Sequence, residues 1–380
     1  MTPLSEGADA FVIEAGHVYL NGASIGPRLR TVHEAGQRAL ERCARPWELD
    51  QETWFDDANA IRPMAAELFG ARPHEMAFVP SVSYGMETAA RNLPLEHGQS
   101  VVCLDRQFPS NHYPWRRKAD AVVADVVTVP TPSDSDWTSA TLEHVETRTA
   151  IVAVPNVHWA DGARLDLHRI GARCREVGAA LVLDLTQSVG VLPTDLGAID
   201  ADFAVAAGYK WILGPYGCGF LFAAERHHTG EPIDPNWITR VGSNRFDKIA
   251  VYTDEYQPGA LRFDAGEYTN YILLPMMKAA LATTTAWSRA GLAESLGDIT
   301  RGLADVAAAF DWTGTAGEHA SPHIIGLEHP TIDARQAAVA LHDHGVKVSA
   351  RDGKLRLSPH LNAAGEQTIS AFRSALASIS

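Results

Sequence analysis

Cysteine is scarce in this chain, and its spacing excludes the sites that cysteine most often builds. The 380 residues include only Cys43, Cys103, Cys174 and Cys218, which lie far apart and form no Cys-x-x-Cys pair. That spacing argues against a zinc site and against a disulfide framework, and it is typical of a protein in a reducing cytosol. We therefore expect no metal ion and a cytoplasmic location.

Long apolar runs and an excess of basic charge are also missing. No run approaches the roughly 20 apolar residues that span a bilayer, and the first ten residues carry Glu6 and Asp9 instead of a basic start before an apolar block. We therefore expect neither a transmembrane helix nor a signal peptide. Acidic residues outnumber basic ones by 46 to 32, which gives a net charge of −14. Because that charge does not attract nucleic acid or an anionic membrane, local groups must capture any anionic ligand.

The residues that are present are those of a soluble globular protein with more than one domain. Apolar residues make up 46% and charged residues 21%, which is ordinary for such proteins. A chain of 380 residues suggests roughly two or three domains. The sequence contains no internal repeat and no low-complexity tract.

Short apolar runs alternate with helical patterns through the middle of the chain. This alternation predicts an α/β fold in which a mostly parallel sheet is buried on both faces. The expected strands are 76–79, 100–104, 121–129, 150–155, 179–185, 203–206 and 219–223. The expected helices among them are 83–91, 141–147 and 167–177.

The pattern changes after about residue 256, where Pro and Gly in 257–259 favour a domain boundary. We expect a large domain at 16–256 and a smaller α+β domain at 257–380, which residues 1–15 also join. The expected helices of the smaller domain are 270–290, 295–310 and 334–344, and its expected strands are 323–327, 346–349 and 355–357.

Asp184 closes one of the predicted strands and Lys210 follows another, 26 residues apart (210 − 184). In an open α/β sheet, ligands bind outside the carboxyl ends of the strands. Alone, Asp184 could be a turn or helix-capping residue, and Lys210 a surface residue. Together they favour a ligand site, because a partly desolvated lysine amine is nucleophilic toward an aldehyde.

The motifs at these positions resemble the class V aminotransferase family of fold-type I enzymes, which depend on pyridoxal phosphate. The family includes cysteine desulfurases, kynureninases, isopenicillin N epimerases and C–S lyases. The resemblance implies a large domain with a seven-stranded sheet between helices, a smaller α+β domain, and a homodimer with shared active sites. The motifs are Asp-x-x-Gln at 184–187, Gly-Tyr-Lys-Trp at 208–211, Phe-Pro-Ser-Asn at 108–111 and Arg-Leu-Ser-Pro-His at 356–360.

The resemblance implies roles around the cofactor ring for five residues. Lys210 would form the Schiff base with the cofactor and move the Cα proton of the substrate. Asp184 would pair with the pyridinium nitrogen and keep it protonated, which preserves the ring as an electron sink. Gln187 and Asn156 would face the phenolic oxygen of the ring. Phe108 would stack on the ring, although burial in the core is the alternative for this side chain.

The resemblance also implies the phosphate contacts. The backbone of Val82 and the hydroxyl of Ser83 would bind the phosphate at a helix N-terminus, where free N–H groups attract anions; an ordinary serine cap is the alternative. Tyr209 would add a donor. Thr269 or Asn270 would reach the phosphate of the partner subunit.

Three further residues are expected on the substrate side. The family pattern gives Arg356 the α-carboxylate, which a guanidinium fork matches in two-point fashion, and the substrate is then an α-amino acid. Without the resemblance, Arg356 would be a surface charge at a strand end. His158 either lines the substrate pocket or is structural. Asn21, at the start of the resemblance, is expected to contact the substrate as well.

One departure from the family narrows the reaction. Desulfurases carry a nucleophilic cysteine just before the carboxylate-binding arginine, and residues 346–354 contain none. Without that thiolate, sulfur transfer by the desulfurase route is not expected. We predict a β-eliminating C–S lyase that acts on a cysteine derivative. Transamination is the alternative, with epimerisation and kynureninase-like hydrolysis behind it, and a non-catalytic homologue that binds the cofactor is a remote one.

Overall fold

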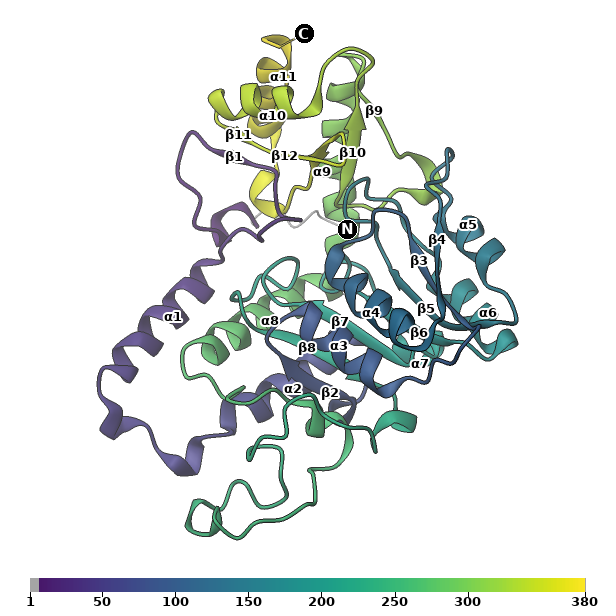
Figure 1. The fold of residues 1–380 in the computed structure, drawn as a ribbon. Helices are drawn as coiled ribbons and strands as arrows, with labels where there is room; N and C mark the ends of the chain where they lie inside the picture. The colour runs from purple at the N-terminus through teal and green to yellow at the C-terminus, as the bar shows by residue number, and fades with distance from the viewer. Residues whose placement is uncertain (1–6, 380) are drawn as a thin grey trace.

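A seven-stranded sheet runs through the larger part of the molecule in the computed structural model, which describes residues 7–379 (Figure 1). The strand order is β2-β8-β7-β6-β5-β3-β4, and only β8 runs antiparallel to its neighbours. The predicted α/β fold with a mostly parallel sheet is therefore confirmed. The strands are β2 (Met76–Val79), β3 (Ser100–Leu104), β4 (Asp125–Val129), β5 (Thr149–Pro155), β6 (Ala180–Asp184), β7 (Phe203–Ala207) and β8 (Gly219–Ala223).

Helices cover both faces of this sheet and explain its nearly continuous apolar strands. Neighbouring residues of β6 point to opposite faces: Leu183 joins one hydrophobic core with Ile61 and Leu281, and Val182 joins the other with Met86. A parallel sheet buried on both faces needs apolar residues at every position. The helices are α1 (Arg30–Cys43), α2 (Asp56–Phe69), α3 (Val82–Asn92), α4 (Tyr113–Val122), α5 (Trp137–His144), α6 (Leu167–Val177), α7 (Leu196–Ile199) and α8 (Leu273–Arg289).

The C-terminal part forms a smaller layer of strands and helices with a core of its own, which includes Leu303, Leu341 and Phe372 (Figure 1). A short parallel pair, β1 (Val18–Tyr19) with β11 (Val346–Lys347), brings the N-terminal region into this part. The boundaries expected at residues 15 and 256 stay predictions. The remaining elements are β9 (Thr313–Gly314), β10 (Ile325–Glu328), β12 (Ser349–Arg351), β13 (Lys354–Leu357), α9 (Leu292–Ala308), α10 (Ala334–Asp343) and α11 (Glu366–Ala377).

Element boundaries differ from expectation where apolar runs were ambiguous. The strand expected at 121–129 begins only at Asp125, because α4 continues to Val122 and the chain turns at Val123, whose φ is 56°. The strand expected at 346–349 divides into β11 and β12, which belong to different sheets. Within residues 7–379, no helix is long and apolar enough to cross a bilayer.

Candidate active site

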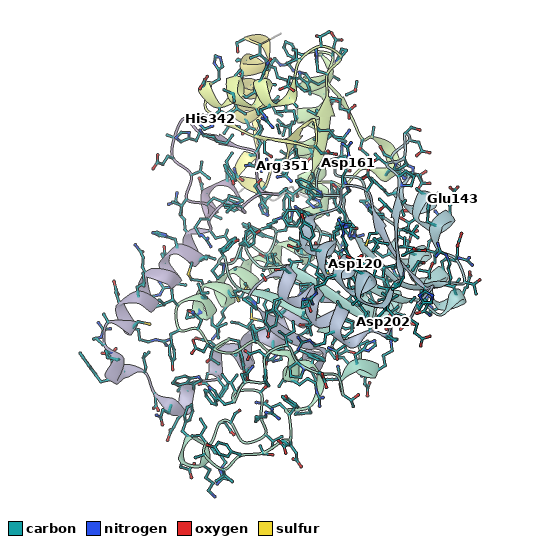
Figure 2. The ribbon with its side chains drawn as sticks, in the orientation of Figure 1. Asp120, Glu143, Asp161, Asp202, His342 and Arg351 are labelled. Carbon is teal, nitrogen blue, oxygen red and sulfur yellow. The ribbon has the colours of Figure 1, made fainter. Side chains whose placement is uncertain are left out.

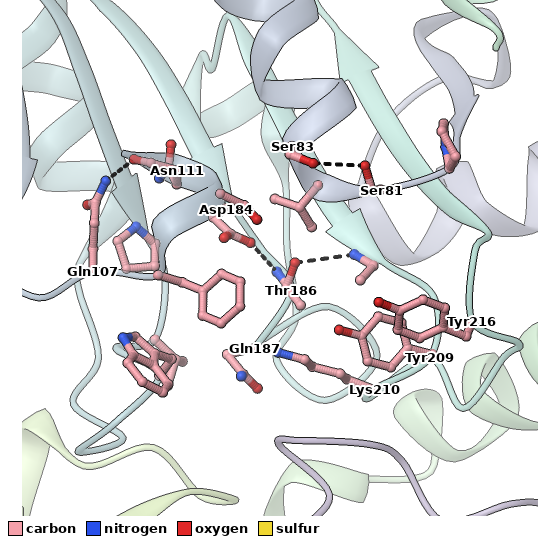
Figure 3. A pocket seen from close by; sticks show the side chains of 18 of the residues that line it. Ser81, Ser83, Gln107, Asn111, Asp184, Thr186, Gln187, Tyr209, Lys210 and Tyr216 are labelled. Atoms are coloured by element: carbon pink, nitrogen blue, oxygen red, sulfur yellow. Dashed lines mark hydrogen bonds between the residues drawn. The ribbon is translucent and has the colours of Figure 1, made fainter. Parts of the chain in front are cut away.

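The carboxyl ends of several sheet strands meet around one cavity of about 290 Å³ (Figure 3). Asp184 is the last residue of β6, and Lys210 follows the end of β7 by three residues. The turn after β2 and the segment after β3 close two further sides. Strands that run in parallel end at the same edge, so residues far apart in the sequence converge here. Seven predicted residues line the cavity: Lys210, Asp184, Gln187, Phe108, Val82, Ser83 and Tyr209.

Lys210 has the electrostatic environment of a nucleophilic amine. Its side chain is only 6% exposed, and its Nζ lies 5.2 Å from the centre of the Phe108 ring. Burial lowers the pKa of Lys210 to about 8, with the negative charge of Asp184 opposing the shift and the charges of Arg356 and Arg351 adding to it. A large fraction of this amine is therefore unprotonated at mildly alkaline pH, where an ordinary lysine is fully charged.

Asp184 is a buried carboxylate held at the cavity wall. The backbone N–H of Thr186 donates to its Oδ1 at 3.0 Å (Figure 3). Burial raises the pKa of Asp184, while the Thr186 hydrogen bond and the charge of Lys210 oppose that rise. A buried carboxylate of this kind gains most from a cationic partner inside the cavity.

Gln187 is fixed beside the cavity by contacts at both ends of its amide. Its Nε2 donates to the carbonyl of Ala23 at 3.1 Å, and its Oε1 accepts from the indole of Trp211 at 2.8 Å. His323, which is fully buried, has its Nε2 2.6 Å from the backbone oxygen of Gln187. His323 precedes β10, so this contact ties Gln187 to the smaller part of the molecule.

The N-terminus of α3 opens onto the cavity. Ser81 caps the helix by accepting from the N–H of Tyr84 at 3.2 Å, and its hydroxyl lies 3.0 Å from that of Ser83. Backbone N–H groups in the first turn of a helix have no intrahelical partner, and the helix dipole favours an anion there. This end of the cavity can hold a phosphate.

Two pairs of aromatic rings also line the cavity. Phe108 meets Trp159 edge to face, with ring centres 5.6 Å apart. Tyr209 and Tyr216 lie against each other at 4.6 Å. Flat apolar faces of this kind suit a planar ring.

Asn111 supplies an unsatisfied donor to the same cavity. Its side chain is 1% exposed, its Oδ1 accepts from the indole of Trp115 at 2.9 Å, and its Nδ2 has no partner within residues 7–379. A buried amide without a partner is costly, so a polar ligand group is expected next to it. With the amine, the carboxylate and the phosphate end, the cavity fits pyridoxal phosphate.

Asn156 and His158 do not line this cavity. The chain bends at Asn156, and Val157 pairs with Arg164 in an isolated bridge. Pro155, Val157 and Trp159 line the cavity, and the two residues between them do not. The Asn156 amide donates to the carbonyl of Leu165 at 3.0 Å and borders a separate cavity.

His158 is a core residue. Its ring is 2% exposed, stacks on Trp137 with centres 5.0 Å apart, and has its Nδ1 3.0 Å from Asp161 Oδ1. The sequence left open whether His158 lines the substrate pocket or is structural, and its surroundings are those of a structural residue.

Thr269 and Asn270 also lie outside the Lys210 cavity. Thr269 Oγ1 accepts from the indole of Trp54 at 2.7 Å, and Asn270 Oδ1 accepts from the N–H groups of Ile272 and Leu273 at the start of α8. Both border a different hollow in this chain, and the contact expected with the phosphate of a partner subunit stays a prediction.

Arg356 and Asn21 both contact Ser24, and none of the three residues lines the cavity. Arg356 is 1% exposed; one of its terminal nitrogens donates to Ser24 Oγ at 2.6 Å and the other to the carbonyl of Trp159 at 2.8 Å. The Ser24 hydroxyl donates in turn to Asn21 Oδ1 at 2.8 Å. Arg356 therefore does not line the cavity itself. It contacts Trp159, whose ring does.

Several lining residues were missed by the sequence reasoning. Ser110, Asn111 and Thr186 lie inside the motifs at 108–111 and 184–187, so the signal was present without a role attached to it. The missed polar and aromatic lining residues are Ser81, Gln107, Ser110, Asn111, Trp159, Thr186 and Tyr216.

Sequence comparisons place this geometry among known proteins. The Aminotransferase class-V family model matches residues 34–378. The chain is 29% identical over 276 residues to a kynureninase of Deinococcus radiodurans, covering 70% of this chain and 65% of that protein. It is 31% identical over 221 residues to a probable cysteine desulfurase of Methanothermobacter thermautotrophicus, covering 55% and 53%. The chain therefore spans less than two thirds of the length of these relatives.

Solved structures show the same fold. A cysteine desulfurase from Thermococcus onnurineus NA1 superimposes with a TM-score of 0.84 at 18% identity, covering 100% of this chain and 98% of that one. The cystine C–S lyase C-DES, in complex with its product cysteine persulfide, gives 0.85 at 18% identity, covering 96% and 98%. Similarity at this level of identity establishes the fold.

Proposed function

The chain belongs to the class V aminotransferase family, and from that membership we propose that it cleaves the Cβ–S bond of a substituted cysteine by β-elimination. Enzymes of this family depend on pyridoxal phosphate, which is the cofactor of this chain. The observation that carries the proposal is that Lys210 is a buried amine of lowered pKa in a cavity that offers no reactive thiolate.

The cysteines argue for elimination and against sulfur transfer to the protein. Of the four, only Cys218 borders the Lys210 cavity. Burial raises the pKa of Cys218 to about 12, so it remains a thiol near neutral pH, and the thiolate is the nucleophilic form. The hairpin of β12 and β13 contains no cysteine.

Four groups would hold the cofactor. We assign the covalent attachment to Lys210, the ring nitrogen to Asp184, the ring face to Phe108, and the phosphate to the first turn of α3 with Val82 and Ser83. Pyridoxal phosphate supplies an electron sink that stabilises the negative charge left when an amino acid loses its Cα proton. We assign Tyr209 a supporting position beside the phosphate end, and Gln187 one beside the ring.

Lys210 would carry the proton in this reaction. Its amine accepts the Cα proton, the Cβ–S bond breaks with its electrons on sulfur, and the departing sulfur takes up a proton. With water, RS–CH2–CH(NH2)–COOH gives RSH, pyruvate and ammonia, which balances without an oxidant or reductant. Arg356 would hold the α-carboxylate, with Asn21 supporting it through Ser24.

A second candidate is kynureninase-like hydrolysis of a Cβ–C bond. It is favoured by the aromatic rings that line the cavity, among them Phe108 and Trp159, which suit an aromatic side chain, and by the similarity to kynureninases. Its amino acid product would be alanine, whereas elimination gives pyruvate, so one assay of both products distinguishes the two candidates.

The test begins with the cofactor and proceeds to products. The purified protein with pyridoxal phosphate should show a visible absorption band that Lys210→Ala abolishes. It should then release pyruvate and ammonia from at least one member of a panel of S-substituted cysteines. Pyridoxamine phosphate without pyruvate would instead indicate transamination, and would overturn the lyase proposal. A protein that binds the cofactor and forms no product from a broad amine panel would support the non-catalytic alternative.

We further propose that the protein is a homodimer in the cytoplasm. Thr269 and Asn270 lie at a surface hollow away from the Lys210 cavity of their own chain, as residues that serve a partner's site would. All four cysteines are unpaired, which suits a reducing compartment.

A further inference from the structure

Two arginines of one hairpin converge on a single uncharged oxygen. Arg351 ends β12 and Arg356 lies in β13, and a terminal nitrogen of each donates to Ser24 Oγ, at 3.3 Å and 2.6 Å. Arg351 lies where the small sheet meets the larger part of the molecule (Figure 2). The Ser24 hydroxyl already donates to Asn21, so its oxygen is a weak acceptor for two cations.

Neither guanidinium has an acidic partner in the part of the chain that the structure describes. The remaining contacts of Arg351 and Arg356 are backbone carbonyls, those of Ala350 and Trp159. The Nε of Arg356 is buried without any partner. Burial, together with the nearby charge of Arg351, lowers the pKa of Arg356 to about 9. Buried charges are normally paired, so Arg356 lacks the anion expected beside it, and the half-buried Arg351 has none either.

Arg356 joins this pair to the site already described. Arg356 donates to the backbone of Trp159, whose ring lines the cavity, and its guanidinium lies 6.0 Å from the centre of that ring. Both arginine charges lower the pKa of Lys210, which means that both are within electrostatic reach of the amine. Neighbouring acidic groups are committed elsewhere: Asp352 Oδ1 accepts from Arg106 at 2.6 Å, and Glu328 pairs with Lys354.

We propose that Arg351 binds a second anionic group of the substrate, so that the amino acid taken by this site carries a carboxylate or similar anion on its side chain as well as its α-carboxylate. This inference rests on the proposed function of the Lys210 site. One carboxylate matches one guanidinium fork, and Arg356 satisfies the α-carboxylate alone. A second anion on the substrate would neutralise Arg351. Without such a cation, the net charge of −14 would repel that anion.

The experiment compares matched ligands on the holoenzyme. Binding of S-carboxymethyl-L-cysteine and of S-methyl-L-cysteine is followed through the absorption of the bound cofactor, and binding of succinate and of propionate is followed by calorimetry. Arg351→Gln should lower the affinity for the dicarboxylates by roughly tenfold or more, which is the loss expected for a charge-assisted hydrogen bond. The affinities for S-methyl-L-cysteine and propionate should change by no more than about twofold.

Two controls separate the possible causes. Lys354→Gln removes one positive charge from the same hairpin, away from Ser24, and should leave the contrast between dicarboxylates and monocarboxylates unchanged. Arg356→Gln should weaken both classes. Equal weakening of both classes by Arg351→Gln would mean that the two arginines share the α-carboxylate, and no effect on either class would mean that Arg351 binds no ligand; each result overturns the proposal. Because succinate and propionate carry no amine and no Cβ–S bond, they bind without turnover, and their binding is read separately from pyruvate release, whose failure would overturn only the lyase function.

Discussion

At the scale of single residues, the chemistry depends on how the fold changes the properties of ordinary groups. Lys210 and Asp184 are both buried at one sheet edge, so burial lowers the pKa of the amine and raises that of the carboxyl, while each charge partly offsets the shift of the other. An exposed lysine would remain protonated well above neutral pH. The burial of this pair is therefore what makes the amine reactive.

The rate at which the cofactor attaches should follow the titration of Lys210. With a pKa near 8, the reactive free amine increases as the pH rises through 8, and the rate at which the visible band appears should rise with it and then level off. Asp184 raises this pKa, so removing its charge in Asp184→Asn should move the midpoint to lower pH. Stopped-flow mixing of cofactor-free protein with pyridoxal phosphate measures the pH midpoint of the attachment rate in the unaltered protein and in the variant. A midpoint above 8 in the variant would contradict the assignment.

The residue scale is also where the sequence reasoning was weakest. Asp184, Lys210 and Phe108 were found because motifs fix their positions at strand ends. Asn156 was expected in the site, and His158 was left open between the substrate pocket and a structural role. The chain bends at Asn156 and turns at Trp159, and Trp159 lines the cavity while Asn156 and His158 do not. An apolar run alone does not define where a strand ends and such a bend begins.

At the scale of elements, α3 links helix formation to ligand binding. Ser81 caps the helix, and the same first turn faces the cavity. A capping serine satisfies one N–H and leaves others available to an anion. The strand-turn-helix unit was predictable from an apolar run followed by serines and a helical pattern.

Ser81→Ala should lower both the free energy of unfolding and the affinity for pyridoxal phosphate. Loss of a helix cap costs about 1 kcal/mol. Asp136→Ala is the matched control, because Asp136 caps α5 by accepting from the N–H of Ser139 at 3.0 Å, away from the Lys210 cavity. Chemical denaturation should show a similar decrease in the free energy of unfolding for both variants. Titration with pyridoxal phosphate should show a lower affinity only for Ser81→Ala. An unchanged cofactor affinity in Ser81→Ala would argue against phosphate binding at this turn.

Element boundaries show where sequence patterns are insufficient. The run 121–129 is apolar enough for one strand, but its first residues complete α4. Residues 346–349 divide between two sheets because β1 pairs with β11, a contact that joins residues more than 300 positions apart (346 − 18 = 328). Local patterns do not encode such distant pairing.

At the scale of the whole molecule, we propose that a second copy binds at aromatic residues carried by two segments of the chain. Trp54 and Trp237 both contact Phe246, with ring centres 5.2 Å and 5.9 Å apart. Trp47 is 78% exposed and Tyr252 is 93% exposed. The segments between α1 and α2 and between β8 and α8 that carry these residues extend from the body of the large part (Figure 1).

Light scattering on the purified protein should give twice the mass of one chain. Tyr252→Glu combined with Trp47→Glu should shift that mass toward a single chain, because charges oppose burial in an apolar interface. Val123→Glu is the control, since Val123 is 71% exposed at the end of α4, and should leave the mass unchanged. A single-chain mass for the unaltered protein would contradict the shared active site.

The central claim is that Lys210 supports elimination in a cavity without a reactive thiolate. It is tested most directly by measuring pyruvate and alanine in the same incubation of the holoenzyme with S-carboxymethyl-L-cysteine and S-methyl-L-cysteine, alongside Lys210→Ala. We predict pyruvate in equal amount to the released thiol from at least the first substrate, no alanine, and neither product from the variant. Alanine without pyruvate, or pyruvate formation that survives Lys210→Ala, would contradict the account.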